Sequence, residues 1–148
     1  MADARIGIIG GSGHEGSGLA LRWAAAGHDV IIGSRSAEKA QEAAQKLNSL
    51  LAGRGQLRGG SNADAAAQAI VVLSVPFAAQ RVTAEALREQ LAGKILIDVT
   101  APLVPPKVSR VQLPAGGSAV AALQSALGDT VKVVSAFQNV SATHLQDL

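Results

Sequence analysis

The sequence contains no cysteine and no tyrosine, and aromatic residues make up 2% of its 148 positions. The absence of cysteine excludes disulfide bonds, thiolate metal sites and a cysteine nucleophile. Because aromatic side chains are so scarce, the core must be built from Ala, Val, Leu and Ile. The length suits one domain with a core of its own, and we expect residues 1–148 to form it.

Charge is also sparse, at 16% of the residues with a formal net charge of +2. The chain has no block of Lys and Arg and no basic stripe with interleaved aromatics, so we expect no nucleic-acid partner. No apolar run approaches the ~20 residues of a membrane span. The N-terminal residues lack the charged and apolar regions of a signal peptide. These features predict a cytoplasmic protein that binds small molecules and no membrane.

Short apolar runs rich in β-branched residues alternate with Ala-rich stretches along the chain. The runs predict strands at Ile6–Ile9, Val30–Ile32, Ile70–Val75, Ile95–Val99 and Val131–Val134, with a weak strand at 57–59. The other stretches predict helices at 16–26, 37–51, 62–68, 77–91 and 117–127, two of them with left-handed caps at Gly27 and Gly128. Four prolines make 100–116 a predicted loop. Alternating strands and helices indicate an α/β fold, a doubly wound, Rossmann-like parallel sheet in a single domain.

A glycine motif follows the first predicted strand. Gly11-Ser12-Gly13-His14-Glu15-Gly16 matches G-x-G-x-x-G and precedes a predicted helix. In this motif the first glycine permits a tight turn and the second lets the backbone approach a pyrophosphate. The third glycine lets helix and strand pack closely, and the phosphate lies at the helix N-terminus. We therefore predict that residues 11–16 bind a dinucleotide.

The end of the second predicted strand carries Ser34 and Arg35, where an acidic residue would accept the adenosine ribose 2′-hydroxyl of NAD. A guanidinium can instead bind a phosphate through two hydrogen bonds. Lys39 follows in the first turn of the next predicted helix, where the helix dipole disfavours a cation unless an anion is bound nearby. These three residues predict a 2′-phosphate site, and hence NADP(H) rather than NAD.

Three further segments should meet at the carboxyl edge of the sheet, where ligands of such folds bind. They contribute the candidate ring-binding residues Ser74, Val75, Pro76, Thr100, Leu103, Gln138, Asn139 and Val140. Each segment combines small or apolar residues with a hydroxyl or an amide, which suits a planar ring. Asp98 also ends a predicted strand, and it is either part of this polar wall or a hydrogen-bonded core acid.

We find no catalytic or metal-binding constellation. The three histidines have no metal-ligand spacing, and His14 either contacts a phosphate or is an exposed loop residue. No nucleophile elbow or paired carboxylates can be identified, so no catalytic residue and no metal ligand is assigned. Hydride transfer requires neither, because the cofactor carries the chemistry and the protein aligns the reactants.

The chain resembles the NADPH-dependent coenzyme F420 reductases. The resemblance rests on Gly10–Leu21, Ala26–Val30 and Gly33–Arg35, then on Ser74–Pro76, Pro102–Val104 and Val134–Ala142. It implies hydride transfer between the nicotinamide C4 of NADP(H) and the deazaflavin C5 of coenzyme F420. By the same resemblance Ser12, Ser34, Arg35 and Lys39 hold NADP, while residues around Val75, Pro76, Leu103, Gln138 and Val140 line the space that the two rings share.

Two departures from the family pattern accompany this resemblance. Gln138 stands where some relatives have histidine, and family members continue past residue 148 into a C-terminal segment that builds a dimer. We therefore expect the N-terminal, dinucleotide-binding part of such an enzyme, with a homodimer as a possible assembly. Two alternatives remain at this point: an NADPH-dependent reductase of another acceptor, such as a flavin or an imine, and a non-catalytic NADP-binding module.

Overall fold

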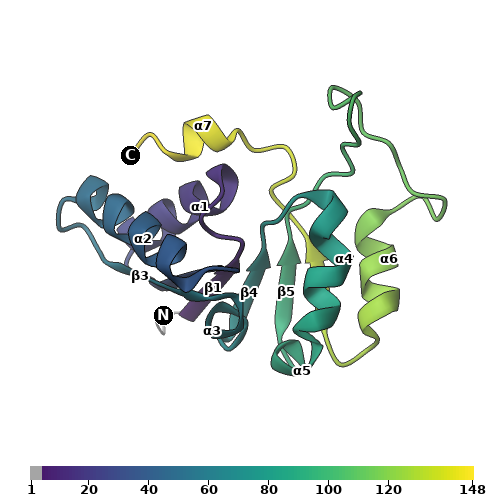
Figure 1. Ribbon diagram of the computed structural model, residues 1–148, viewed down its shortest axis with the longest axis horizontal. Coiled ribbons are helices and arrows are strands. Elements are labelled where there is room, and N and C mark those ends of the chain that lie inside the picture. Colours follow the sequence, from purple (N-terminus) through teal and green to yellow (C-terminus); the bar gives the residue numbers. More distant parts are fainter. Residues whose placement is uncertain (1–4) are drawn as a thin grey trace.

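The computed structural model describes residues 5–148 as one six-stranded parallel sheet with helices on both faces (Figure 1). The strands are β1 (Arg5–Ile9), β2 (Asp29–Ser34), β3 (Leu57–Ser61), β4 (Ile70–Leu73), β5 (Ile95–Asp98) and β6 (Lys132–Ser135). Their order in the sheet is β3-β2-β1-β4-β5-β6. The chain thus forms the central strand β1 first and then β2 and β3 on one side of it. It then crosses over and forms β4, β5 and β6 on the other side. The predicted doubly wound α/β fold is confirmed.

The helices are α1 (His14–Ala25), α2 (Ala37–Leu51), α3 (Asn62–Ala66), α4 (Phe77–Ala86), α5 (Arg88–Leu91), α6 (Ala119–Leu127) and α7 (Ala142–Leu145). One face of the sheet packs against α1 and α2, and Leu19, Leu21 and Leu47 lie in that core. The other face packs against α3 to α6, with Leu91, Leu123 and Leu127 in its core. Because both faces are covered, the inner strands are continuously apolar, as the sequence shows.

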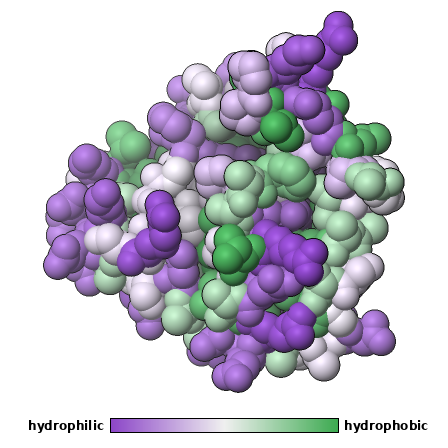
Figure 2. Space-filling model, turned by 45° about the vertical axis from the view of Figure 1, so that its right-hand side comes forward, coloured by the Kyte–Doolittle hydropathy of each residue, from purple (hydrophilic) through white to green (hydrophobic). Residues whose placement is uncertain are grey.

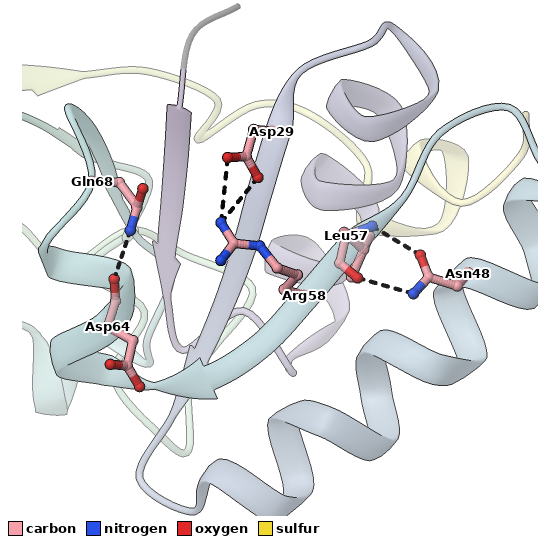
Figure 3. Close-up of polar contacts among 6 residues, drawn as sticks. All are labelled: Asp29, Asn48, Leu57, Arg58, Asp64 and Gln68. Atoms are coloured by element: carbon pink, nitrogen blue, oxygen red, sulfur yellow. Dashed lines mark hydrogen bonds and ion pairs between the residues drawn. The ribbon is translucent and has the colours of Figure 1, made fainter.

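Edge strand β3 contains two glycines and is held by side chains of its neighbours (Figure 3). The Asn48 side chain of α2 accepts from the Leu57 N–H and donates to the Leu57 carbonyl, both at 2.9 Å. Arg58 forms an ion pair with Asp29 of β2 at 3.1 Å. These contacts fix a strand whose apolar pattern alone is weak, and β3 extends two residues beyond the predicted 57–59.

Several predicted boundaries differ from the structure. The predicted helix 77–91 is two helices, because Leu87 leaves helical geometry and packs into the second core. Helix α1 begins at His14 rather than at 16, and α6 begins after the cap Ser118 rather than at 117. Gly27 has the predicted positive φ of 92°. Gly128 has a φ of 75° but an extended ψ of −173°, so the predicted left-handed cap is wrong there.

The C-terminal segment was not predicted to contain a helix. After β6 the chain passes back over the carboxyl edge of the sheet, and the short helix α7 lies beside α1 (Figure 1). The Cβ that a larger residue would have at Gly18 would lie 2.6 Å from the Leu145 Cβ, so glycine permits this close approach. Arg22 of α1 donates to the carbonyls of His144 at 2.9 Å, Leu145 at 3.0 Å and Asp147. The first helix is thus joined to the last one.

Candidate functional site

The glycine motif forms the turn between β1 and α1. Gly10 has a φ of 72°, a conformation that glycine adopts without strain. The Gly11 N–H donates to the carbonyls of Ile8 at 3.2 Å and Gly33 at 2.9 Å. A Cβ at Gly11 would lie 2.7 Å from the Ile32 Cβ. Gly11 therefore serves the packing of the turn against β2, and its own N–H is already used.

Gly13 and Gly16 have opposite surroundings. A Cβ at Gly16 would lie 2.8 Å from the Gly11 Cα and 3.0 Å from the Ser74 Oγ, so helix and turn pack as closely there as the motif requires. A Cβ at Gly13 would meet one backbone atom, the Gly10 carbonyl oxygen, at 3.5 Å. The space beside Gly13 is open to a ligand, although the fold itself would accept a larger residue there.

The N-terminus of α1 is free to receive an anion. Gly13 stands at the N-cap and has no side chain to accept from the first backbone N–H groups. Unpaired N–H groups and the positive end of the helix dipole favour a phosphate at such a position. His14 is exposed, and burial raises the pKa of the half-buried Glu15 carboxyl in the same turn.

A cavity of about 780 Å³ opens beside this turn. It contains seven of the predicted site residues, which are Ser12, Gly13, Ser34, Arg35, Ser74, Val75 and Pro76. The loops after β1, β2 and β4 thus converge on one volume at the carboxyl edge of the sheet, as expected for a ligand site in this topology. Its combination of a guanidinium, hydroxyls and an apolar wall suits a phosphorylated ring system.

The same cavity has lining residues that the sequence analysis did not identify. Ser61, Asn62 and Ala63 come from the start of α3, and Ala79, Val82, Thr83, Ala86 and Leu87 come from α4 and its end. Asn62 also accepts from the Gly10 N–H at 3.1 Å and so fixes the turn. Two features of the sequence could have identified these lining residues. Ser61 and Asp64 have capping-box spacing, and the α4 residues recur at helical intervals along one face.

Lys39 lies in a second cavity of about 540 Å³ between α1 and α2. Ser12, Gly13 and His14 also line it, so the two cavities meet at the phosphate turn. The Ser36 hydroxyl accepts from the Lys39 N–H and so caps α2, which places Lys39 in the first turn of that helix. Arg35 and Lys39 therefore approach the turn from two different sides.

The remaining predicted residues line neither of these cavities. Leu103 and Val140 expose 40% and 39% of their surface, and Asn139 is exposed. The Gln138 amide nitrogen donates to the Asp98 carbonyl at 2.7 Å and to the Ser135 hydroxyl at 2.9 Å. The structure thus groups Val75 and Pro76 with Arg35, apart from Leu103, Gln138 and Val140.

Thr100 belongs to a buried polar cluster at the end of β5. The Gln80 amide of α4 donates to the Thr100 hydroxyl at 3.0 Å and to the Asp98 carboxylate. The Thr100 N–H donates to the other carboxylate oxygen at 2.9 Å. Burial raises the pKa of Asp98, and the hydrogen bonds from Thr100 and Gln80 oppose that shift. Of the two alternatives for Asp98, the structure shows a hydrogen-bonded core acid.

Within residues 5–148 the structure brings no three metal-ligating side chains together. In the same part of the chain, no helix has the length and apolarity required to cross a membrane.

The chain matches the family model described as "NADP oxidoreductase coenzyme F420-dependent" over residues 5–102. It belongs to this family. The matched region contains the phosphate turn, the Ser34-Arg35 pair and strands β1 to β5. Most of the sheet therefore lies within the part of the chain that matches the family.

Individual relatives extend the similarity over the whole chain. An F420-dependent NADP reductase from Methanothermobacter thermautotrophicus is 44% identical over 97% of this chain and 65% of its own length. A crystal structure of an F420-dependent NADP reductase from Arthrobacter superimposes with a TM-score of 0.76 at 28% identity, covering 95% of this chain and 65% of that one. The chain thus spans about two thirds of the length of these relatives.

An imine reductase from Bacillus cereus shares the fold, with a TM-score of 0.61 at 21% identity over 88% of this chain and 39% of that one. At this identity the similarity shows the fold alone.

Proposed function

We propose that this member of the family binds NADP(H) and transfers hydride between it and coenzyme F420. The observation that carries the proposal is the cavity in which Ser34 and Arg35 meet the phosphate turn, in a chain of this family. The curated relative named above carries the same activity in its name. Residues 1–148 act as one NADP-binding domain in this proposal.

The chain's own residues fit the cofactor. The open space beside Gly13 and the uncapped N-terminus of α1 receive the diphosphate. Ser34 and Arg35 hold the 2′-phosphate, and Lys39 adds a cation from the adjoining cavity. Val75 and Pro76 provide an apolar wall for a planar ring. The site thus holds NADP by its phosphates and positions its rings along the carboxyl edge of the sheet.

We assign the second ring to the segments after β5 and β6. Leu103, Gln138, Asn139 and Val140 follow these strands, and the exposed surface of Leu103 and Val140 gives aliphatic contacts for it. Thr100 is buried beneath this wall. Bound NADPH supplies the hydride at its nicotinamide C4. The residues named here align the two rings, and the proton that F420 reduction takes up besides the hydride comes from solvent.

The first experiment mixes the protein with NADPH and oxidised coenzyme F420 and follows the loss of deazaflavin absorbance. Bleaching that depends on the protein, and that is much slower with NADH, is the expected result. A flavin and a cyclic imine serve as competing acceptors. If NADP binds and F420 is not reduced, the F420 assignment is wrong. Reduction of another acceptor would then identify a different reductase, and no reduction of any acceptor would identify a binding module.

We also propose that the protein acts in the cytoplasm, binds no nucleic acid and forms a homodimer. Four further aliphatic residues of loop 100–116 support the dimer, namely Val104, Val108, Val111 and Leu113, each between 41% and 66% exposed. Figure 2, with the right-hand side of Figure 1 turned forward, shows apolar patches between polar side chains on that surface. Light scattering of the purified protein would measure the mass directly, and a monomeric mass would contradict the dimer.

A further inference from the structure

A carboxylate without a counter-cation lies beneath the proposed ring-binding edge. Asp98 is fully buried, while Gln80 and Thr100 expose 4% and 5% of their surface. Neither of the two ion pairs within residues 5–148 includes Asp98. Its carboxylate instead accepts hydrogen bonds from the Gln80 amide and the Thr100 N–H. These donors stabilise the charged form of the group without neutralising its charge.

The position of this charge in the fold gives it a candidate partner. Asp98 is the last residue of β5, and in the register of the sheet it pairs with Leu73 of β4 and Ser135 of β6. Leu73 directly precedes Ser74, Val75 and Pro76, the wall assigned above to the NADP ring. The strand order places β4 to β6 on the opposite side of the phosphate turn from Ser34 and Arg35. A dinucleotide whose adenosine phosphate lies at Arg35 directs its other half toward these strands.

The nicotinamide ring carries a positive charge when oxidised and none when reduced. A buried negative charge near the ring therefore favours the oxidised form, because the low dielectric of the interior screens the interaction only partly. We propose that Asp98, held by Gln80 and Thr100, acts as a positioning and tuning residue that favours binding of NADP⁺ over NADPH and so promotes hydride donation from NADPH. This inference rests on the proposed binding of NADP and is independent of the acceptor.

The test compares the dissociation constants of NADP⁺ and NADPH by calorimetry at pH 8, in the wild-type protein and in Asp98→Asn. This substitution preserves the shape of the side chain and an acceptor for the Thr100 N–H, but it removes the charge. We expect the ratio of the NADP⁺ to the NADPH dissociation constant to rise at least about threefold. Loss of packing alone would weaken both forms by the same factor and leave this ratio unchanged.

Asp129→Asn is the matched control, because it removes the same charge from an exposed residue after α6. It should leave the ratio at its wild-type value. If Asp98→Asn does not fold, Asp98→Ser provides the same comparison, since its hydroxyl can still accept from the Thr100 N–H. An unchanged ratio in a folded Asp98 variant overturns the proposal. Absence of binding of either form by the wild-type protein would instead contradict the NADP assignment itself.

Discussion

The guanidinium of Arg35 is exposed at the end of β2, on the cavity that also contains Ser34 and the phosphate turn. Replacing it with alanine removes the charge-assisted contact that we propose with the 2′-phosphate, a group that NAD lacks. We expect Arg35→Ala to weaken NADP binding by about 1.5–3 kcal/mol and to affect NAD binding far less. Titration with both cofactors checks this.

Arg58→Ala is the control for Arg35→Ala. It also removes one positive charge, but Arg58 pairs with Asp29 and does not line the cavity. We expect its affinity for NADP to stay at the wild-type value. An equal loss of NADP and NAD affinity in Arg35→Ala would contradict the 2′-phosphate assignment.

Asp64 has a pH-dependent role at the start of α3. The Ser61 hydroxyl, followed by the Ser61 N–H, donates to its carboxylate and lowers its pKa below the ordinary value of 3.8. A lowered folded-state pKa means that the stabilisation is present above the unfolded-state pKa and is lost as the pH falls through the folded-state value. Asp64→Asn should therefore lower the melting temperature at pH 7, and the difference should shrink on acidification below the ordinary pKa of 3.8. Thermal melts across this range measure it, and a constant difference would exclude the carboxylate as the cause.

Individual residues of the site were predictable where their chemistry is local. Arg35 indicates a phosphate because it replaces an acid at a known distance from the glycines. Asn62 could not be found in this way, since its contact with Gly10 spans 52 residues and depends on β3 pairing with β2. The burial of Thr100 likewise depends on a residue far away in the sequence, Gln80 of α4.

At the level of the phosphate turn, Gly13 and Gly16 of the motif have different effects on binding and stability. Gly13→Val adds its side chain to the open space, so we expect loss of NADP binding with an unchanged melting temperature. Gly16→Val places a Cβ against the Gly11 backbone and should lower the melting temperature itself. Calorimetry and thermal melts of both variants separate the two effects. Retained NADP affinity in Gly13→Val would contradict the phosphate-turn assignment.

The docking of α7 on α1 depends on Arg22, which holds three carbonyls at the end of the last helix. Arg22→Met keeps the length of the side chain but removes its hydrogen bonds to those carbonyls, of which the His144 carbonyl retains a backbone donor. We expect a loss of about 1 kcal/mol of unfolding free energy and faster amide hydrogen exchange in residues 141–147.

Arg81→Met removes a surface ion pair with Glu85 and is the control for Arg22→Met. It should leave exchange in residues 141–147 unchanged. Wild-type exchange in Arg22→Met would show that Leu145 packing alone holds α7.

Elements with a strong apolar period were predicted within a few residues, whereas α7 was missed. Four residues are too few to show a helical period, and α7 forms because Ser141 caps it and Arg22 donates to its C-terminal carbonyls. The break at Leu87 was missed for a related reason. Alanine-rich sequence continues through it, and only packing into the second core decides where the helix bends.

On the scale of the whole molecule, the same sheet forms the core and carries the loops that line the site. NADP at one hundred times its dissociation constant should stabilise the folded state by about 2.7 kcal/mol. For a chain of this size, this stabilisation corresponds to a rise of roughly 5–10 °C in the melting temperature. We expect the protein to unfold in a single transition. Differential scanning calorimetry with NADP and with NAD measures it. An unshifted transition, or two transitions, would contradict ligand binding to a single domain.

The overall topology was predictable because alternating apolar runs and helices leave few ways to build a parallel sheet. The placement of the three loops around one cavity follows from that topology. Which ring each wall residue faces does not, since it depends on loop paths such as 100–116 that no local pattern specifies.

The contact between Arg22 and Leu145 spans 123 positions. During synthesis the ribosome adds about 5–20 residues per second from the N-terminus onward. Helix α1 therefore exists for several seconds before its last partner has been translated, and the Gly18 surface stays uncovered for that time. A nascent chain that has not yet reached Leu145 therefore lacks the contacts of Arg22 and Gly18 with α7.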